Sequence, residues 1–566
     1  MTPGGGDMAE TAAEYIVEQL RAWGVRTVFG VTGSAVFPIL EALSRRAGLR
    51  YVTARHEEGA ALMASAHAKL TGELAVCLAH AGPGAAHLIG GLYDAQRDGA
   101  PVLALTGEIP EDRWGTTAKQ SSAQNLMMAD CTGWSRLAVS AAEVPELLLS
   151  ALRFATAREE VAHLAVPVDV QAAPVGLGRP RPAEPDAYLR RSPAPDEAAV
   201  AKAAEILGRA RRPGVLVGRG AAGLGTQVLA LAERLQAPVA VSLFAKGVVP
   251  DDHPLAVGVL GEAGSPYSAQ AFADRDAVAV LGSTWWPPAG AVPADAAVVQ
   301  IDTHAERIGA RHSLTLGIAA DLAAVLPALT RRLPERPLPA AHGTGKWGWL
   351  TAQRWEGWDA MPVHPARLMA ELRAALPEDT IICVDTGLAT LWYGGYFASR
   401  HETTLLSGRW RTMGFGLPAA LAAKLARPER AVVAICGDGG FGMSLPEILT
   451  AAQHGIAVTA VVLNNGTLGE EAAKQAQQGL AVWGTDLGNT DFAAVARAAG
   501  LEGVMVAHPE EISAAVRAAL ASGRPAVVDV PTAFVPTPSL LPPAELPLAA
   551  DRPALEAGIA RPVARI

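Results

Sequence analysis

The chain has few cysteines, no excess of basic charge and no long uninterrupted apolar run. Its four cysteines lie far apart, with neither a disulfide framework nor metal-ligand spacing, which indicates a reducing compartment. The net charge of −9 gives no reason to expect nucleic-acid binding. Charges and prolines interrupt every candidate bilayer span, and residues 1–7 lack a signal-peptide pattern. These absences predict a cytoplasmic protein without an integral membrane segment.

The chain is long enough for about three domains, and half of its 566 residues are hydrophobic. Two proline-rich stretches, 173–195 and 333–345, are typical of linkers. They separate three stretches in which short apolar strands alternate with Ala- and Leu-rich helices, the pattern of doubly wound parallel sheets. We therefore expect an α/β fold of three such domains, at residues 8–175, 196–333 and 362–535, followed by a tail at 536–566.

Polar residues follow two apolar runs in the last third of the chain. Gly437-Asp438-Gly439-Gly440 comes directly after residues 431–436, and Asn464-Asn465-Gly466-Thr467 comes directly after residues 457–463. Each run is typical of a buried parallel strand, with a helix-like stretch at 444–454 between them. Because ligands bind at the carboxyl ends of such strands, both polar segments are candidates for one site.

The donors in these segments suit a divalent cation. The Asp438 carboxylate, the Asn465 amide oxygen and the Thr467 carbonyl would form half of an all-oxygen shell, which Mg²⁺ completes with phosphate oxygens and water. The glycines would let the backbone approach a phosphate closely. The alternative is that both segments are simple turns.

At this spacing the two segments resemble the Mg²⁺-diphosphate motif of thiamine-diphosphate enzymes. These enzymes also need a glutamate that protonates the aminopyrimidine ring of the cofactor, so that its C2 carbon can lose a proton. Residues 51–60 fit, because a short strand is followed by His56-Glu57-Glu58 and a small-residue helix at 60–69. The resemblance assigns the catalytic carboxylate to Glu57. Alternatively, both glutamates are ordinary acids at a helix start.

The order of motifs is similar to the pyruvate oxidase and acetolactate synthase branch of this family, and the resemblance runs from about Glu10 to Phe534. In this branch a bulky residue, here Met413, lies under the cofactor and bends it, although a lone methionine can also be core filler. The resemblance implies cofactor contacts at Glu57, Gly82, Thr386, Gly387, Met413, Gly437, Asp438, Gly439, Gly440, Asn465 and Thr467.

The central third contains a second glycine motif. Residues 218–223 satisfy G-x-G-x-x-G after an apolar strand, which taken alone predicts NAD binding. The strand at 238–242, however, does not end in the expected acid. In the resembled branch this domain binds FAD or no cofactor. The segment Gln300-Ile301-Asp302 favours FAD, whereas 282–288 lacks the pattern expected beneath a flavin, so FAD stays open.

Two positions near the substrate depart from the resembled pattern. Lys119-Gln120 stands where relatives carry Phe-Gln, and Glu470-Glu471 stands where they carry two apolar residues over the reacting carbon. Glu471 beside the cofactor would change proton transfer and disfavour a second anionic substrate. Alternatively, both glutamates merely begin a helix. Lys119 either anchors a substrate carboxylate or forms an ion pair with a glutamate.

The resemblance implies an Mg²⁺- and thiamine-diphosphate-dependent enzyme whose active site lies between two subunits of a homodimer or homotetramer. The expected reaction is decarboxylating cleavage of a short 2-oxo acid such as pyruvate, followed by oxidation through FAD or by carboligation, with Glu57, Lys119, Gln120 and Glu471 as catalytic candidates. One alternative is a decarboxylase or C–C lyase without flavin. Another is a non-catalytic scaffold, against which the intact Glu57, Asp438 and Asn465 argue.

Overall fold

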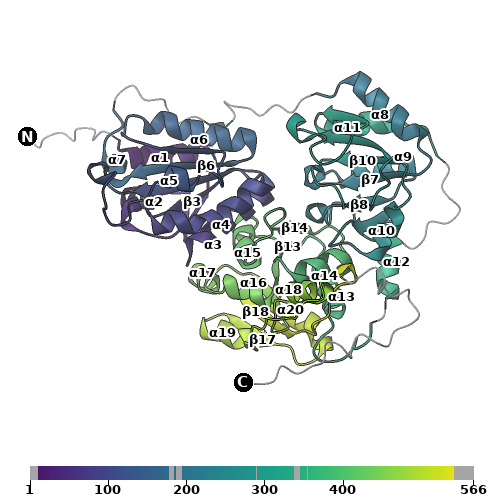
Figure 1. Cartoon of the computed structure of the whole chain (residues 1–566). Helices are drawn as coiled ribbons and strands as arrows, with labels where there is room; N and C mark the ends of the chain where they lie inside the picture. Colours follow the sequence, from purple (N-terminus) through teal and green to yellow (C-terminus); the bar gives the residue numbers. More distant parts are fainter. Residues whose placement is uncertain are drawn as a thin grey trace, which may run out of the picture.

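The computed structural model describes residues 10–176, 184–185, 194–288, 290–336, 345–353 and 355–540. Within them the chain forms three six-stranded sheets whose paired strands are parallel, so the expected α/β fold is confirmed. We call residues 10–176, 194–336 and 355–540 the first, central and third parts. Figure 1 shows the first part at the upper left, the central part at the upper right and the third part below them. The domain boundaries stay predictions, and residues 541–566 of the expected tail lie outside the described residues.

The first sheet has the order β2-β1-β3-β4-β6-β5. Its middle strands are buried along their whole length, because helices cover both faces of a parallel sheet. The strands are β1 Thr27–Gly30, β2 Arg50–Thr53, β3 Ala75–Ala79, β4 Val102–Glu108, β5 Trp134–Leu137 and β6 Val161–Pro167. The helices are α1 Ala12–Ala22, α2 Phe37–Ser44, α3 Glu57–Thr71, α4 Pro83–Asp98, α5 Gln124–Met127, α6 Val144–Arg158 and α7 Val168–Ala172.

The central sheet has the order β12-β11-β10-β7-β8-β9. The strands are β7 Pro213–Val217, β8 Val239–Val241, β9 Ala256–Val259, β10 Ala277–Leu281, β11 Ala297–Asp302 and β12 Leu316–Ala319. The helices are α8 Glu197–Arg209, α9 Gly225–Leu235, α10 Pro266–Phe272 and α11 Leu322–Arg332, and α12 Gly345–Ala352 follows this part.

The third sheet has the order β14-β13-β15-β16-β18-β17. In this order β14 lies on one side of β13 and β15 on the other, so the sheet grows in opposite directions from β13. Such sheets bind ligands at this point, and the edge here is formed by the carboxyl ends of β13, β15 and β16. The strands are β13 Ile381–Val384, β14 Thr403–Leu406, β15 Val432–Gly437, β16 Thr459–Asn464, β17 Glu502–Met505 and β18 Ala526–Pro531. The helices are α13 Pro365–Ala375, α14 Leu388–Tyr396, α15 Gly416–Ala426, α16 Asp438–Met443, α17 Glu447–His454, α18 Gly469–Gln477, α19 Phe492–Ala498 and α20 Ile512–Ala521.

Buried polar contacts join the parts. Lys69 of α3 is 1% exposed and lies 2.7 Å from both Asp94 and Asp98, and it also donates to the carbonyl of Leu406 in the third part. Asp98 in turn accepts from the backbone nitrogen of Gly408. The first part is therefore fixed to the third by a charged network as well as by packing of α3 on α15. None of the described helices combines the length and apolarity that a membrane span requires.

Candidate active site

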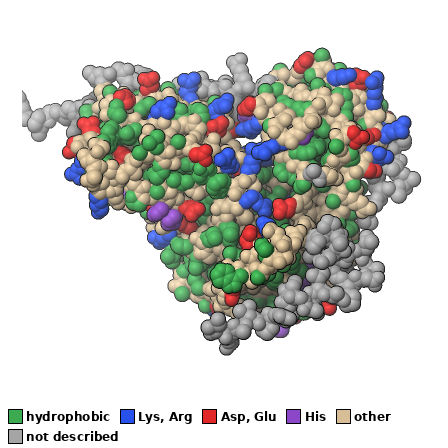
Figure 2. All heavy atoms as spheres, in the orientation of Figure 1, with side chains coloured by type: hydrophobic (Ala, Val, Ile, Leu, Met, Phe, Trp, Pro, Cys, Tyr) green, Lys and Arg blue, Asp and Glu red, His purple; other side chains and the backbone are tan. Residues whose placement is uncertain are grey.

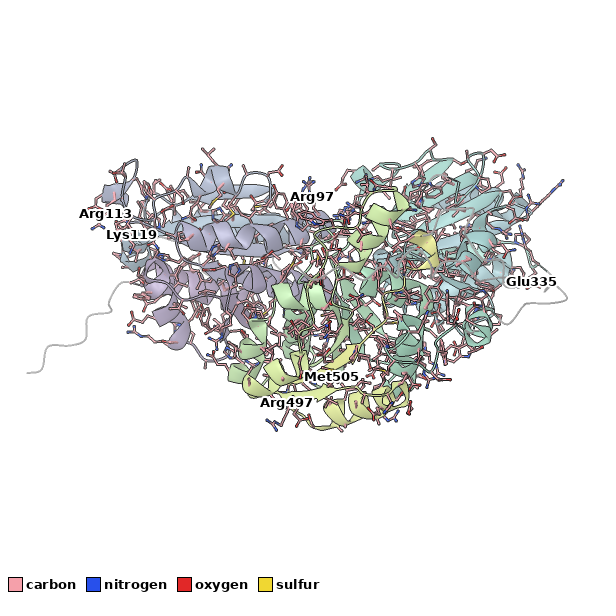
Figure 3. All side chains as sticks on the ribbon, turned by 60° about the horizontal axis from the view of Figure 1, so that its bottom comes forward. Arg97, Arg113, Lys119, Glu335, Arg497 and Met505 are labelled. Carbon is pink, nitrogen blue, oxygen red and sulfur yellow. The ribbon has the colours of Figure 1, made fainter. Side chains whose placement is uncertain are left out.

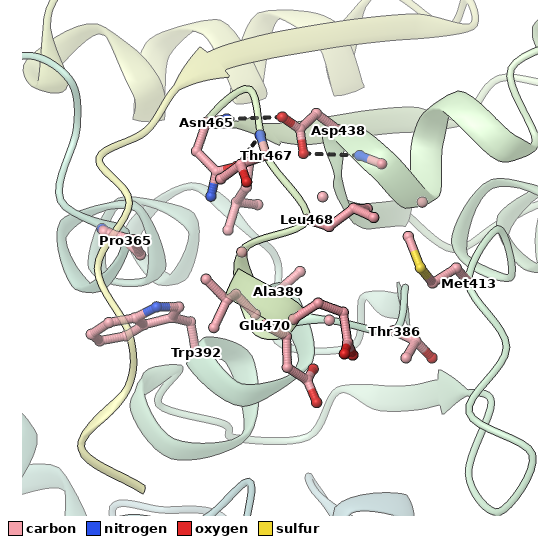
Figure 4. Close-up of a pocket in the computed structure, with 18 of the residues that line it drawn as sticks. Pro365, Thr386, Ala389, Trp392, Met413, Asp438, Asn465, Thr467, Leu468 and Glu470 are labelled. Atoms are coloured by element: carbon pink, nitrogen blue, oxygen red, sulfur yellow. Dashed lines mark hydrogen bonds between the residues drawn. The ribbon is translucent and has the colours of Figure 1, made fainter. Parts of the chain in front are cut away.

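A cavity of about 410 Å³ lies at the carboxyl edge of the third sheet. Three strand ends supply its polar wall: β13 leads to Thr386, β15 to Asp438 and β16 to Asn465. In Figure 4, Asp438, Asn465 and Thr467 lie at one end of the cavity, and Glu470 lies toward the opposite end. The residues predicted from the sequence that line this cavity are Thr386, Gly387, Met413, Gly437, Asp438, Gly439, Gly440, Asn465, Thr467 and Glu471.

The candidate metal ligands already contact one another. The Asp438 Oδ2 atom accepts from the backbone nitrogens of Asn465 at 3.2 Å and Gly466 at 2.6 Å. The Asn465 Oδ1 atom accepts from the backbone nitrogen of Thr467 at 3.1 Å. Burial raises the pKa of Asp438, while its backbone hydrogen bonds act in the opposite direction. This compact set of oxygens fits Mg²⁺.

The glycines of this wall have two different roles. A Cβ atom at Gly387 or Gly437 would meet nothing within 4 Å, so the backbone there is open. A Cβ at Gly439 would lie 2.6 Å from the Leu468 side chain, and one at Gly440 would lie 2.5 Å from Asp385. We infer that the first pair leaves space for a diphosphate, whereas the second pair is required for packing. Gly387 also precedes α14, whose first turn has no side-chain cap, an arrangement that favours an anion.

Asp385 is a fully buried residue beside this wall, directly before Thr386, that the sequence did not single out. Its carboxylate accepts from the backbone nitrogens of Thr386 at 2.8 Å, Gly414 at 2.9 Å and Gly416 at 2.9 Å. Burial raises its pKa to about 6, although these hydrogen bonds lower it. The contacts fix the segment around Met413 against the end of β13. An acid directly after the apolar strand was the available signal.

The two consecutive glutamates differ in their surroundings. Both lie in the first turn of α18, but the Glu470 side chain is 9% exposed and that of Glu471 is 61% exposed. Lys474 lies 2.7 Å from Glu470 and 3.5 Å from Glu471. The role expected for Glu471 stays a prediction, because both residues line the cavity.

The predicted residues of the first part form a separate group. The Glu57 Oε2 atom lies 2.9 Å from His87 Nδ1. Gln120 has a positive φ of 66°, and its Oε1 atom lies 3.0 Å from a His80 ring nitrogen. A Cβ at Gly82 would lie 2.6 Å from the Gln120 carbonyl, so this glycine allows the loop to approach. His80 and His87 were missed in the sequence.

Lys119 directly precedes Gln120 in the chain and is exposed. Figure 3 shows it at the outer edge of the first part, where Arg113 also lies. Among the described residues, none that lines the cavity of the third part belongs to the first part. A single chain therefore does not bring Glu57, Lys119 or Gln120 to Asp438.

A second cavity, of about 610 Å³, lies where all three parts meet. Its wall includes Asp302 and the arginines Arg219, Arg307 and Arg409, and Figure 2 shows Lys and Arg side chains gathered at the centre of this face. The glycine motif at 218–223 borders it. Cβ atoms at its first two glycines would clash with the backbone at Gly282, so close packing explains those glycines.

Comparisons with known proteins match all three parts. The matching family models are described as the N-terminal TPP binding domain (residues 10–129), the central domain (residues 200–329) and the C-terminal TPP binding domain (residues 385–530) of thiamine pyrophosphate enzymes.

Curated relatives match over most of their length. A Bacillus subtilis protein, YdaP, whose name describes it as thiamine pyrophosphate-containing, is 36% identical and covers 92% of this chain and 91% of its own. The large subunit of acetolactate synthase isozyme 1 of Escherichia coli is 30% identical, with coverages of 92% and 93%. The pyruvate oxidase of Lactiplantibacillus plantarum is 30% identical, with coverages of 88% and 85%.

A solved structure is similar along most of the chain. It is the thiamine diphosphate-dependent 4-hydroxybenzoylformate decarboxylase of Rhodococcus jostii, which superimposes with a TM-score of 0.79 at 26% identity. The match covers 93% of this chain and all of the other.

Proposed function

The chain belongs to the thiamine pyrophosphate enzyme family, in its pyruvate oxidase and acetolactate synthase branch, and we propose that it cleaves the bond beside the keto group of a short 2-oxo acid with loss of CO₂. We propose that the two-carbon fragment is then oxidised or joined to an acceptor carbonyl. One observation carries the proposal: the residues expected to hold the diphosphate and Mg²⁺ line a single cavity.

The residues of the proposed site would have different roles in binding the cofactor and in shielding it from water. Thiamine diphosphate, when bound, would supply a nucleophilic carbon for attack on the 2-oxo group and a cationic ring that accepts the electrons of the broken bond. Asp438, Asn465 and the Thr467 carbonyl would hold Mg²⁺ and, through it, the diphosphate. Met413 would support the cofactor from below. Leu388 and Trp392 line the same cavity and would exclude water.

Glu57 would hold the proton shared with the aminopyrimidine ring. Its side chain is 12% exposed and contacts His87, but it lies outside the cavity of its own chain. We therefore propose at least a homodimer in which Glu57 and Gln120 of one chain face Asp438 of another. Exposed apolar side chains such as Leu126 at 72% and Trp483 at 83% support an interface.

The central cavity supports FAD as a further cofactor. The guanidinium groups at its wall, among them those of Arg219, Arg307 and Arg409, suit a diphosphate, and the Asp302 carboxylate suits ribose hydroxyls. A decarboxylase without flavin is the second candidate function, and the similarity to a solved decarboxylase structure favours it.

The test incubates purified protein with thiamine diphosphate, Mg²⁺ and a set of short 2-oxo acids, and measures CO₂ release. We expect CO₂ release that requires both thiamine diphosphate and Mg²⁺. If no 2-oxo acid of the set releases CO₂, the proposal is contradicted. A flavin absorption spectrum of the purified protein separates the two candidates: its presence supports oxidation or carboligation, and its absence supports the simple decarboxylase.

A further inference from the structure

Glu470 is a buried acid in the wall of the thiamine diphosphate cavity. It lies in the first turn of α18, and Figure 4 places it across the cavity from Asp438 and Asn465. Apolar residues of the same wall include Leu388, Ala389 and Trp392. The metal end and this acidic end are therefore distinct, and the acidic end is where a substrate would meet the cofactor.

The carboxylate of Glu470 is only partly satisfied. Its Oε1 atom accepts from Lys474 Nζ at 2.7 Å and lies 3.9 Å from an Arg411 nitrogen. Its Oε2 atom is buried and has no hydrogen-bond partner among the described residues. A buried acceptor without a partner costs free energy, and this cost is larger for a charged group. A ligand in the cavity can supply the missing donor once a rotation of the carboxylate brings Oε2 to the cavity surface.

Two cations lie beside this acid. Arg411 is 30% exposed and Lys474 is 36% exposed, and both line the cavity. Arg411 also has a positive φ of 57°, which costs free energy for a residue with a side chain. These cations can bind the carboxylate of a 2-oxo acid, while Glu470 is left to accept from another group on the same molecule.

We propose that Glu470 determines substrate specificity by accepting a hydrogen bond from the substrate. The substrate class is then a short 2-oxo acid with a hydroxyl group beside the reacting carbonyl, such as hydroxypyruvate, rather than pyruvate. A site built to bind a hydroxyl strongly rejects the analogue that lacks it, because a methyl group leaves the buried carboxylate unpaired. This inference rests on the proposed function for the reaction class.

The test compares wild type, Glu470→Leu and Glu146→Leu as holoproteins. Glu146 is a suitable control because it is also an acid in the first turn of a helix, α6, but it is exposed and does not line the cavity. The first readout is the ratio of kcat/KM for hydroxypyruvate to that for pyruvate. The second is calorimetric binding of glycerate and lactate, which differ by one hydroxyl and carry no 2-oxo group. Glu470→Gln, which keeps an acceptor oxygen, and thermal unfolding check for loss of the fold.

In wild type and Glu146→Leu, we expect hydroxypyruvate to be preferred over pyruvate, and glycerate over lactate, by about 10- to 100-fold, the range of one hydrogen bond to a charged group. Glu470→Leu should lose both preferences, and Glu470→Gln should keep part of them. Equal use of the two 2-oxo acids by wild type and Glu470→Leu would overturn the inference and leave the proposed function standing.

The calorimetric readout separates the two claims. If neither 2-oxo acid is consumed but glycerate binds more tightly than lactate only when Glu470 is present, recognition by Glu470 is supported and the proposed reaction is contradicted. If wild type neither consumes the 2-oxo acids nor distinguishes glycerate from lactate, both claims fail.

Discussion

The Glu447 Oε1 atom accepts a hydrogen bond from the backbone nitrogen of His56 at 3.1 Å. It also accepts from the backbone nitrogen of Arg55 at 3.1 Å, and Glu447 is buried, which raises its pKa. His56 caps α3, which begins at Glu57. The third part of the chain therefore fixes the start of the helix that carries the expected catalytic glutamate.

Glu447→Ala should destabilise the protein by about 2–4 kcal/mol, because two backbone donors lose a charged acceptor. The measurement is the free energy of unfolding in urea at neutral pH. Glu447→Gln is the control that keeps one acceptor oxygen, and it should lose less. A change below about 0.5 kcal/mol in the alanine variant, typical of a surface substitution, would show that this contact does not hold the helix start.

Glu57→Gln should leave cofactor binding intact, because the residues expected to hold the diphosphate line the cavity of the third part, which Glu57 of the same chain does not line. It should slow proton–deuterium exchange at C2 of bound thiamine diphosphate by about 10²- to 10⁴-fold, the range of lost acid–base assistance. The exchange is followed by NMR of quenched samples. Glu58→Gln is the neighbouring control, and a larger effect there would move the assignment to Glu58.

Lys69→Met should destabilise the protein by about 3–5 kcal/mol, because Asp94 and Asp98 would lose their shared cation in a buried site. Chemical denaturation measures the loss. Lys202→Met is a suitable control, since Lys202 pairs with Glu205 on the surface and such pairs contribute little. Equal effects of the two substitutions would contradict the structural role of Lys69.

Lys346 predicts a pH dependence of stability. Its Nζ atom donates to Ser265 at 2.6 Å and to the Gly395 carbonyl at 2.7 Å, and burial lowers its pKa from 10.5 to about 7. Between these two values the unfolded chain holds a proton that the folded chain has released, so this residue makes stability rise with pH.

Lys346→Met should remove this contribution. We expect the increase in unfolding free energy from about pH 7 to about pH 10 to be smaller in the variant than in wild type, by urea denaturation at each pH. Comparing the two proteins cancels the other titrating groups. The same pH dependence in both would show that Lys346 stays protonated in the folded state.

The sequence predicted the fold and the close approach of Asp438 and Asn465 because the information there is local. Apolar runs mark β15 and β16, and Asp438 and Asn465 follow them directly. Because β15 and β16 are neighbouring parallel strands, the two residues that follow them lie close together. The contact between Glu447 and His56 could not be predicted in this way, because it depends on how two sheets pack.

Consecutive helix residues show the same limit. Glu470 and Glu471 share one turn, and the sequence alone favoured Glu471 as the residue facing the substrate. Packing buries Glu470 and leaves Glu471 largely exposed, because adjacent positions on a helix point about 100° apart. Which one faces the reacting carbon depends on the rotation of α18, which no local pattern determines.

The metal assignment has two internal controls. Asn465→Ala removes a neutral ligand and should weaken cofactor binding less than loss of the Asp438 carboxylate. Thr467→Val should leave binding nearly intact, because only the backbone carbonyl of Thr467 is expected to contact the metal. Calorimetric titration of each variant with thiamine diphosphate in the presence of Mg²⁺ measures both effects. A larger loss in Thr467→Val than in Asn465→Ala would contradict the ligand assignment.

The central claim is that Asp438 holds thiamine diphosphate through Mg²⁺. Its most direct test is calorimetric titration of wild type and Asp438→Ala with thiamine diphosphate, each with and without Mg²⁺. We expect tight binding by wild type that requires Mg²⁺, and binding by Asp438→Ala that is much weaker and no longer responds to Mg²⁺. Equal, magnesium-dependent binding by the two proteins would contradict it.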